Sequence, residues 1–167
     1  MNRWIEVLKK NSLEGVKTLI EQGEDINEEN ESGESVLAYA LRSHCDFDIL
    51  MHLLESGADM YDTDYEGVSI FEMAITYNNI KMVEYFIQNG IDVNETKRKS
   101  GFTPLMCASC YGRYDIAKIL LDNAADKDAV DSKGLSSVDF ARKMNKKSLL
   151  NLYGFDENSP KNTVYAR

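Results

Sequence analysis

Apolar and polar positions along this chain repeat with the period of short helices. Three segments carry apolar residues at positions i, i+1, i+4 and i+5, a spacing that places them on one side of a helix. These segments are residues 49–54, 82–87 and 116–121, and each follows a second apolar segment, at residues 36–40, 70–74 and 104–108. The pattern predicts pairs of helices of two to three turns, joined by tight turns such as residues 77–79.

Glycines recur between these predicted helices. One series, spaced by 34, 34 and 33 residues, is Gly33, Gly67, Gly101 and Gly134. A second series, spaced by 34 and 33 residues, is Gly23, Gly57 and Gly90. We expect the second series to end the second helix of each pair in the left-handed conformation, which is cheap only without a Cβ atom. Ala124 continues that series and should cost about 1 kcal/mol there.

These repeated phrases resemble the ankyrin repeat family. The resemblance rests on residues 101–108 and 120–126, with closing phrases at 53–59 and 87–94, and covers about residues 3–153. It implies an all-α ankyrin-repeat solenoid of stacked helix-turn-helix units with short β-hairpin-like loops, here called fingers. The implied repeats are about 3–30, 31–64, 65–98, 99–131 and 132–153, the first and last being degenerate caps. We expect residues 154–167 to be a mobile tail.

The chain departs from the family pattern at a few positions. The histidine that usually follows the Pro-Leu phrase is absent, and Ala38, Glu72, Met106 and Asp139 stand in its place. The second repeat has one extra residue near positions 43–48, which should distort the turn between its helices.

Composition limits the class of protein. The 167 residues include 19 basic and 28 acidic side chains, a net charge of −9, which argues against broad nucleic-acid binding. No apolar run approaches the roughly 20 residues of a membrane span, and residues 1–10 are too charged for a signal peptide. Three cysteines are an odd number that fits a reducing compartment. We therefore expect a cytoplasmic monomer without nucleic-acid or membrane partners.

Few residues could carry chemistry. Cys107 and Cys110 have the spacing of a redox or metal pair, although Cys107 also occupies an ordinary packing position between repeats. Residues 62–67 resemble half of a calcium-binding loop, but Met73 stands where that loop needs a glutamate. With two histidines and no phosphate-binding glycine motif, we expect neither an enzyme nor a bound cofactor or metal.

Charge is distributed unevenly along the chain. Residues 24–66 hold thirteen acidic side chains and one basic side chain, whereas residues 97–167 hold thirteen basic and eight acidic ones. The third finger is basic through Lys97, Arg98 and Lys99. These charges either keep the protein soluble or steer a partner with a basic patch toward the first two fingers.

The resemblance also implies that a partner contacts the concave face, made of finger tips and first-helix residues. Four aromatic side chains fall on it, and such residues either stiffen the stack or supply binding energy. The partner-binding candidates are Tyr65, Glu66, Tyr77, Phe102, Tyr111, Arg42, Glu34 and Met144.

The function that these observations favour is a non-catalytic protein–protein interaction module. Two alternatives stay open at the level of sequence. One is an accessory protein that binds or delivers a cofactor such as haem to a bacterial enzyme, and the other is a secreted effector that binds host proteins.

Overall fold

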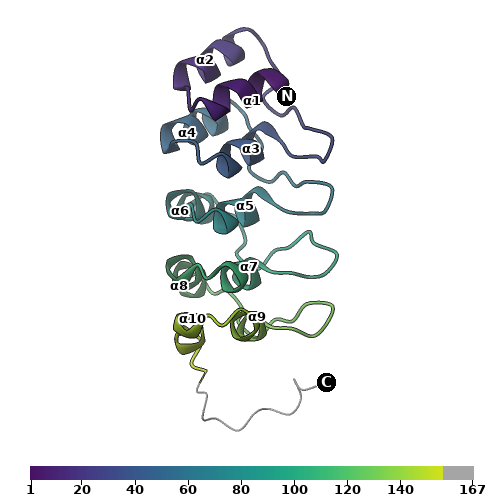
Figure 1. The fold of residues 1–167 in the computed structure, drawn as a ribbon, viewed down its shortest axis with the longest axis vertical. Coiled ribbons are helices and arrows are strands. Elements are labelled where there is room, and N and C mark those ends of the chain that lie inside the picture. The colour runs from purple at the N-terminus through teal and green to yellow at the C-terminus, as the bar shows by residue number, and fades with distance from the viewer. Residues whose placement is uncertain (156–167) are drawn as a thin grey trace. The chain divides into compact units, whose positions relative to one another are not determined.

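The computed structural model describes residues 1–155, and within this range the chain folds into ten helices with no extended strand. The helices are α1 (Asn2–Lys9), α2 (Leu13–Glu21), α3 (Val36–Arg42), α4 (Phe47–Glu55), α5 (Ile70–Thr76), α6 (Ile80–Gln88), α7 (Pro104–Tyr111), α8 (Tyr114–Asp122), α9 (Ser137–Lys143) and α10 (Lys147–Leu152) (Figure 1). This arrangement of paired short helices confirms the predicted all-α repeat-solenoid class. The predicted mobility of residues 154–167 falls almost wholly outside the described residues.

The chain divides into two compact units, which are described separately. The N-terminal unit comprises Met1–Ile91 and holds α1 to α6, whereas the C-terminal unit begins at Asp92 and holds α7 to α10. Their charges differ. The N-terminal unit has eighteen acidic and six basic side chains, and residues 92–155 have eight acidic and eleven basic ones.

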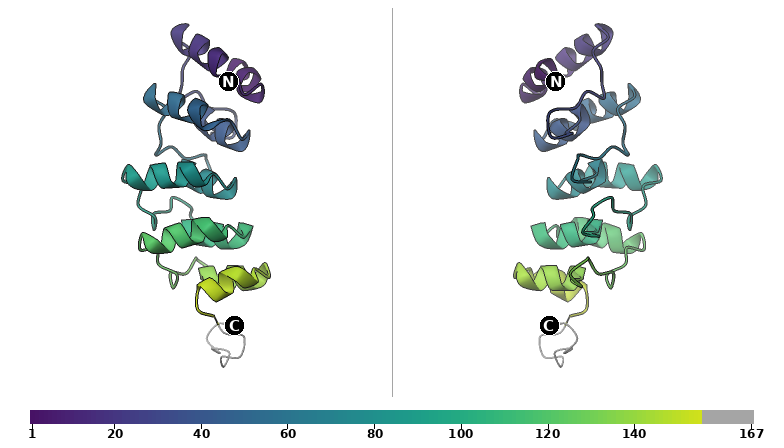
Figure 2. Two further views of the ribbon diagram at one scale, coloured as in Figure 1. Left: turned by 90° about the vertical axis from the view of Figure 1, so that its left-hand side faces the viewer. Right: turned by 90° about the vertical axis from the view of Figure 1, so that its right-hand side faces the viewer.

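In the N-terminal unit the helices form two rows. The first helices of the pairs pack side by side, α3 between α1 and α5, and α2 packs on α4 in the second row. Each first helix also packs on the second helix of its own pair. The side views in Figure 2 show these helices lengthwise, with one row in front of the other. In the C-terminal unit the same scheme recurs, with α7 packed on α9 and α8 on α10.

The core consists of the apolar positions that repeat along the sequence. In the first helices, Ala40, Ala74 and Ala108 are each fully buried. In the second helices the largest buried side chain is Phe86, and Leu50, Leu53 and Leu120 are also inaccessible to solvent. Burying these side chains supplies the main stabilisation, at roughly 25 cal/mol per Å² of apolar surface.

Hydroxyl side chains start the first helices. Ser35, Ser69, Thr103 and Ser136 each accept a hydrogen bond from the backbone N–H three residues later, at 3.1–3.4 Å. Thr103 stands before Pro104 at the first helical position, as the sequence predicts. In the last pair Asp139 completes a capping box, because its carboxylate accepts from the N–H of Ser136.

Left-handed residues end the second helices, as expected. Gly23, Gly57 and Gly90 have φ of 78°, 104° and 94°, and Ala124 keeps the same conformation with φ of 66°. The extra residue in the second repeat is also accommodated locally. The turn between α3 and α4 spans four residues where the turn between α5 and α6 spans three. Each turn keeps one residue with a positive φ, His44 at 54° and Asn78 at 56°, so the extra residue leaves this feature of the turn unchanged.

Candidate functional site

Each of the two fingers of the N-terminal unit is held in shape by one side chain near the start of its loop. Asn30 Oδ1 accepts hydrogen bonds from the N–H groups of Ser32 and Glu34, both at 3.0 Å. Asp64 Oδ1 does the same for Glu66 and Val68, both at 2.9 Å. These bonds fold each loop into a narrow hairpin that ends in an isolated bridge, Glu29 with Ser35 and Thr63 with Ser69.

The two fingers of the N-terminal unit contact each other. The N–H of Tyr65 donates to the carbonyl of Ser32 at 3.4 Å. The ring of Tyr65 lies so close to Gly33 that a Cβ atom there would come within 2.6 Å of it. Glycine at this position therefore serves two purposes, since it permits φ of 78° and leaves room for the neighbouring tyrosine.

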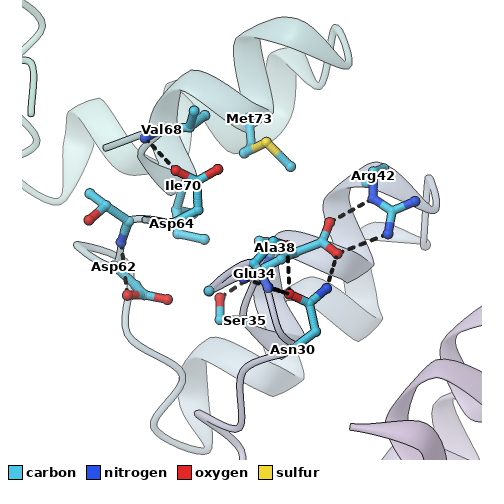
Figure 3. A pocket seen from close by; sticks show the side chains of 13 residues that line it. Asn30, Glu34, Ser35, Ala38, Arg42, Asp62, Asp64, Val68, Ile70 and Met73 are labelled. Atoms are coloured by element: carbon cyan, nitrogen blue, oxygen red, sulfur yellow. Dashed lines mark hydrogen bonds and ion pairs between the residues drawn. The ribbon is translucent and has the colours of Figure 1, made fainter. Parts of the chain in front are cut away.

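Between these fingers and the helices that follow them lies a pocket with a volume of about 340 Å³. Figure 3 shows its lining, which comes from both fingers and from the sides of α3 and α5. The lining residues are Asn30, Ser32, Gly33, Glu34, Ser35, Ala38, Arg42, Asp62, Thr63, Asp64, Val68, Ile70 and Met73.

One wall of the pocket carries a charge pair that neutralises itself. Arg42 donates from Nε to Glu34 Oε1 at 2.6 Å and from a terminal nitrogen to Oε2 at 2.9 Å. Asn30 Nδ2 donates to the same carboxylate at 2.8 Å, which holds Glu34 in place. The hydrogen bond to Glu34 raises the pKa of Arg42 above its ordinary value. Glu34 and Arg42 together thus add no net charge to the pocket.

The opposite wall carries net negative charge. Asp62 and Asp64 both line the pocket and project from the second finger (Figure 3). Asp62 Oδ1 accepts from the N–H of Thr63 at 2.8 Å, and Asp64 Oδ1 holds the finger turn. Each carboxylate accepts these hydrogen bonds through one oxygen, and the donors are backbone amides. The bonds therefore leave the negative charge of each carboxylate without a compensating cation.

Apolar side chains line the pocket between its polar walls. Ala38 comes from α3, whereas Ile70 and Met73 come from α5, and Met73 extends toward the space between the walls (Figure 3). An apolar surface beside a carboxylate pair suits a side chain with a hydrocarbon stem and a cationic end, which is the chemistry of lysine and arginine.

The structure places the predicted partner-binding residues of the N-terminal unit in different environments. Tyr65 is 73% exposed at the tip of the second finger, and Glu66 beside it is also exposed. Glu34 and Arg42 pair in the pocket wall. Tyr77 is half-buried, and its ring meets the edge of His44 with centroids 5.6 Å apart.

The predicted residues of the C-terminal unit also differ from one another. Phe102 is half-buried, because its ring packs edge-on against Phe140 with centroids 5.3 Å apart and lies under Arg98 at 5.4 Å. Tyr111 and Met144, in contrast, are each 51% exposed at the ends of neighbouring helices. The predicted aromatic set therefore contains both packed and exposed side chains.

Of the residues that line the pocket, Glu34 and Arg42 were among the predicted site residues, whereas Asp62, Asp64 and Met73 were not. The sequence marks the two aspartates only as members of an acidic finger, and it marks Met73 as a packing residue. The signal in the sequence is the position of Asp64, because it aligns with Asn30 and Asp131, whose side-chain acceptors shape their own fingers.

The surroundings of Cys45 and Cys110 favour the neutral thiol over the thiolate. Cys107 is fully buried within α7, and Cys110 is half-buried. Burial raises the pKa of Cys110, although the charge of Lys143 acts in the opposite direction. Burial also raises the pKa of Cys45 to about 11. Among residues 1–155, no group of three or more His, Cys, Asp or Glu side chains is placed to hold a metal ion.

The sequence matches a family model described as ankyrin repeats (3 copies), over residues 5–97 and again over 46–131. It also resembles the E3 ubiquitin-protein ligase hecd-1 of Caenorhabditis elegans, with 36% identity over 98 residues that cover 58% of this chain and 4% of that protein. The human palmitoyltransferase ZDHHC13 is 30% identical over 95 residues, 57% of this chain and 15% of that protein.

A longer alignment is found with alpha-latrocrustotoxin-Lt1a of Latrodectus tredecimguttatus, which is 31% identical over 143 residues, 84% of this chain. This chain spans only 10% of the toxin, and the spans for the ligase and the transferase are similarly small. None of the helices within residues 1–155 is long and apolar enough to cross a membrane.

Proposed function

This chain belongs to the ankyrin repeat family, and we propose that it is a non-catalytic module that binds a partner protein through its finger loops and first helices. Ankyrin repeats generally serve as protein–protein interaction modules, and their fold is typically non-catalytic. The named activities of the ligase and the transferase belong to proteins of which this chain matches a small part. In this proposal the protein acts as a monomer in the cytoplasm and binds neither nucleic acids nor membranes.

The partner that we propose presents a basic segment to the N-terminal unit. The observation that carries this proposal is the pocket between the two fingers, where Asp62 and Asp64 face an apolar surface that includes Met73. A lysine or arginine side chain can lay its hydrocarbon stem on that surface and bring its charge to the carboxylates. The volume of about 340 Å³ is at the lower end of the range of small-ligand sites, and it suits one side chain of an extended segment.

The surroundings of the pocket favour the same partner. Tyr65 and Glu66 stand exposed beside it, so an aromatic contact and a further negative charge lie at its rim. The N-terminal unit as a whole has a net charge of −12, from its eighteen acidic and six basic side chains. This field raises the rate at which a basic segment reaches the pocket, and salt screens it over about 10 Å at 0.1 M.

A random peptide library displayed on phage tests the proposal with a matched pair of variants. The peptides selected on the unmodified protein should include a set with lysine or arginine, and the affinity of this set should fall at least tenfold in Asp62→Asn/Asp64→Asn. Asparagine keeps the acceptor that shapes the finger, as Asn30 does in the first finger. The control Glu21→Gln/Glu84→Gln removes the same charge from exposed positions on α2 and α6 and should bind as the unmodified protein does.

Two results would contradict the proposal. A selection that yields no peptide with lysine or arginine would remove the assigned partner chemistry. Equal losses of affinity in the asparagine variant and in the control would show that overall charge matters and the pocket does not.

A further inference from the structure

The C-terminal unit carries a second surface, of opposite charge, at the turns between its paired helices. Three of the large apolar side chains that are exposed in this unit lie there. Tyr111 and Met144 are each 51% exposed, and Tyr114 is 41% exposed. Tyr111 is the last residue of α7, Met144 follows α9 directly, and α7 packs on α9. Tyr114 begins α8 on the other side of the same turn. We call these three side chains and the cations around them the turn surface.

Cations surround the exposed apolar side chains. The guanidinium of Arg113 lies 5.9 Å from the centre of the Tyr111 ring. The stem of Lys146 lies over Gly112, where a Cβ atom would come within 3.1 Å of its Cδ and Cε. Lys143 lies close enough to Cys110 to oppose the effect of burial, which raises the pKa of this thiol. The turn surface therefore combines apolar anchors with three positive charges.

The corresponding turn of the N-terminal unit is built differently. Tyr77 follows α5 directly, at the position equivalent to Tyr111, but Tyr77 is half-buried against His44. Asn78 and Asn79 stand where Gly112 and Arg113 stand in the C-terminal unit. Exposed anchors with a cationic rim are thus a property of the C-terminal unit and do not follow from the repeat pattern alone.

We propose that the turn surface docks an acidic segment of a partner protein that carries one aromatic or aliphatic anchor residue. Tyrosine and methionine supply adaptable contact area, and the three cations complement the charge of aspartate and glutamate. A short acidic segment fits better than a nucleic acid or an anionic membrane, because the net charge of −9 of the whole chain repels an extended polyanion.

This proposal does not depend on the pocket of the N-terminal unit. A partner with both a basic and an acidic segment could use both surfaces, and each can be tested alone. The test is selection of a random 12-residue peptide library displayed on phage, followed by titration of the selected peptides with fluorescein labels. We expect selected peptides in which aspartate or glutamate flanks an aromatic residue or leucine.

Four double variants locate the binding. Tyr111→Ser/Met144→Gln removes the anchors, Lys143→Gln/Lys146→Gln removes the charge, and either should weaken these peptides at least tenfold. The control Lys118→Gln/Lys127→Gln removes the same charge from other exposed positions of the C-terminal unit and should leave affinity unchanged. Asp62→Asn/Asp64→Asn should also leave it unchanged, which separates this proposal from the first. Circular dichroism confirms that each variant is folded.

Several results would overturn the proposal. One is a selection that yields no acidic peptide. Another is a set of acidic peptides that bind Lys143→Gln/Lys146→Gln as tightly as they bind Lys118→Gln/Lys127→Gln. The assigned partner would also be wrong if a 20-nucleotide single strand or phosphatidylserine vesicles bound instead and lost affinity in the anchor variant. Sedimentation velocity tests whether the protein forms dimers. A dimer that is lost in Tyr111→Ser/Met144→Gln would mean that a second copy of this chain occupies the turn surface.

Discussion

The hydroxyl of Tyr153 lies 2.7 Å from Oγ of Ser109, and both side chains are buried. Ser109 already donates its proton to the carbonyl of Leu105 at 3.0 Å, so the tyrosine must be the donor in the pair. The bond joins the residue that follows α10 to the middle of α7. Burial raises the pKa of Tyr153 to about 12, against an ordinary value of 10.

This raised pKa predicts a loss of stability in alkali. Below pH 10 the phenol is protonated in both the folded and the unfolded chain, and its contribution to folding is complete. Between pH 10 and 12 only the unfolded chain loses the proton, so the free energy of unfolding should fall by about 2 to 3 kcal/mol. Urea titrations from pH 8 to 12 measure this fall.

Tyr153→Phe removes the titrating group and isolates its effect. At pH 8 the variant should be about 1 kcal/mol less stable, because one buried hydrogen bond is lost. That difference should shrink or reverse as the pH approaches 12. Tyr114→Phe, at an exposed position, serves as the control, and a difference for Tyr153→Phe that stays constant with pH would contradict the assignment.

Ala124 stores backbone strain that glycine would release. Its φ of 66° is the conformation that glycine adopts at the ends of α2, α4 and α6. Ala124→Gly should raise the free energy of unfolding by about 1 kcal/mol, and Gly57→Ala should lower it by a similar amount. Gly57 is a suitable counterpart, because a Cβ atom there would meet nothing within 4 Å, so only the backbone conformation is tested. Chemical denaturation that shows no gain for Ala124→Gly would argue against strain.

Ser137 buries a hydroxyl that has no hydrogen-bond partner among the described residues. Ser109 is equally buried, but its hydroxyl is bonded to both Leu105 and Tyr153. Ser137→Ala should therefore stabilise the protein by about 1 kcal/mol, whereas Ser109→Ala should destabilise it by a similar amount. Thermal melts of the two variants check the contrast, and equal effects would show that helix propensity decides both.

Asp64 combines a structural role with a charge, and two substitutions separate them. Asp64→Ala removes the acceptor of two backbone hydrogen bonds and should lower the free energy of unfolding by about 1 to 2 kcal/mol. Asp64→Asn keeps that acceptor and should leave stability within about 0.5 kcal/mol. The comparison is made by urea denaturation at neutral pH. Equal losses in both variants would mean that the charge of the carboxylate holds the finger.

Much of the fold could be predicted from the sequence, because its repeating features have local causes. The spacing of apolar residues fixes which side of each helix is buried, as at Ala40 and Ala74. Capping hydroxyls such as Thr103 and left-handed positions such as Gly90 act within a few residues of themselves. Each of these features can be recognised without knowing what lies across the molecule.

The candidate site was harder to predict, since its properties depend on which side chains meet in the folded structure. Tyr77 and Tyr111 occupy equivalent positions in the sequence, yet only Tyr77 is covered, by the ring of His44 from the preceding repeat. The charge of Glu34 is cancelled by Arg42 eight residues away, which leaves Asp62 and Asp64 as the acidic wall. Residue type alone does not reveal these pairings.

The finger that precedes α7 differs from the others in how its tip is secured. Arg98 stands where Asn30, Asp64 and Asp131 lock their loops, and its own N–H is bonded to Thr96 Oγ1 at 3.1 Å. Within residues 1–155 this is the finger without a bridge before a first helix. Its tip is closed by backbone bonds, since the N–H of Gly101 donates to the carbonyl of Arg98 at 2.9 Å and the N–H of Ser132 donates to the carbonyl of Ser100 at 2.7 Å. Extra residues are therefore better spliced in before Thr96, outside these bonds, than at the tip. An epitope tag or a fluorescent reporter placed between Glu95 and Thr96 would leave these bonds and the acidic pocket undisturbed.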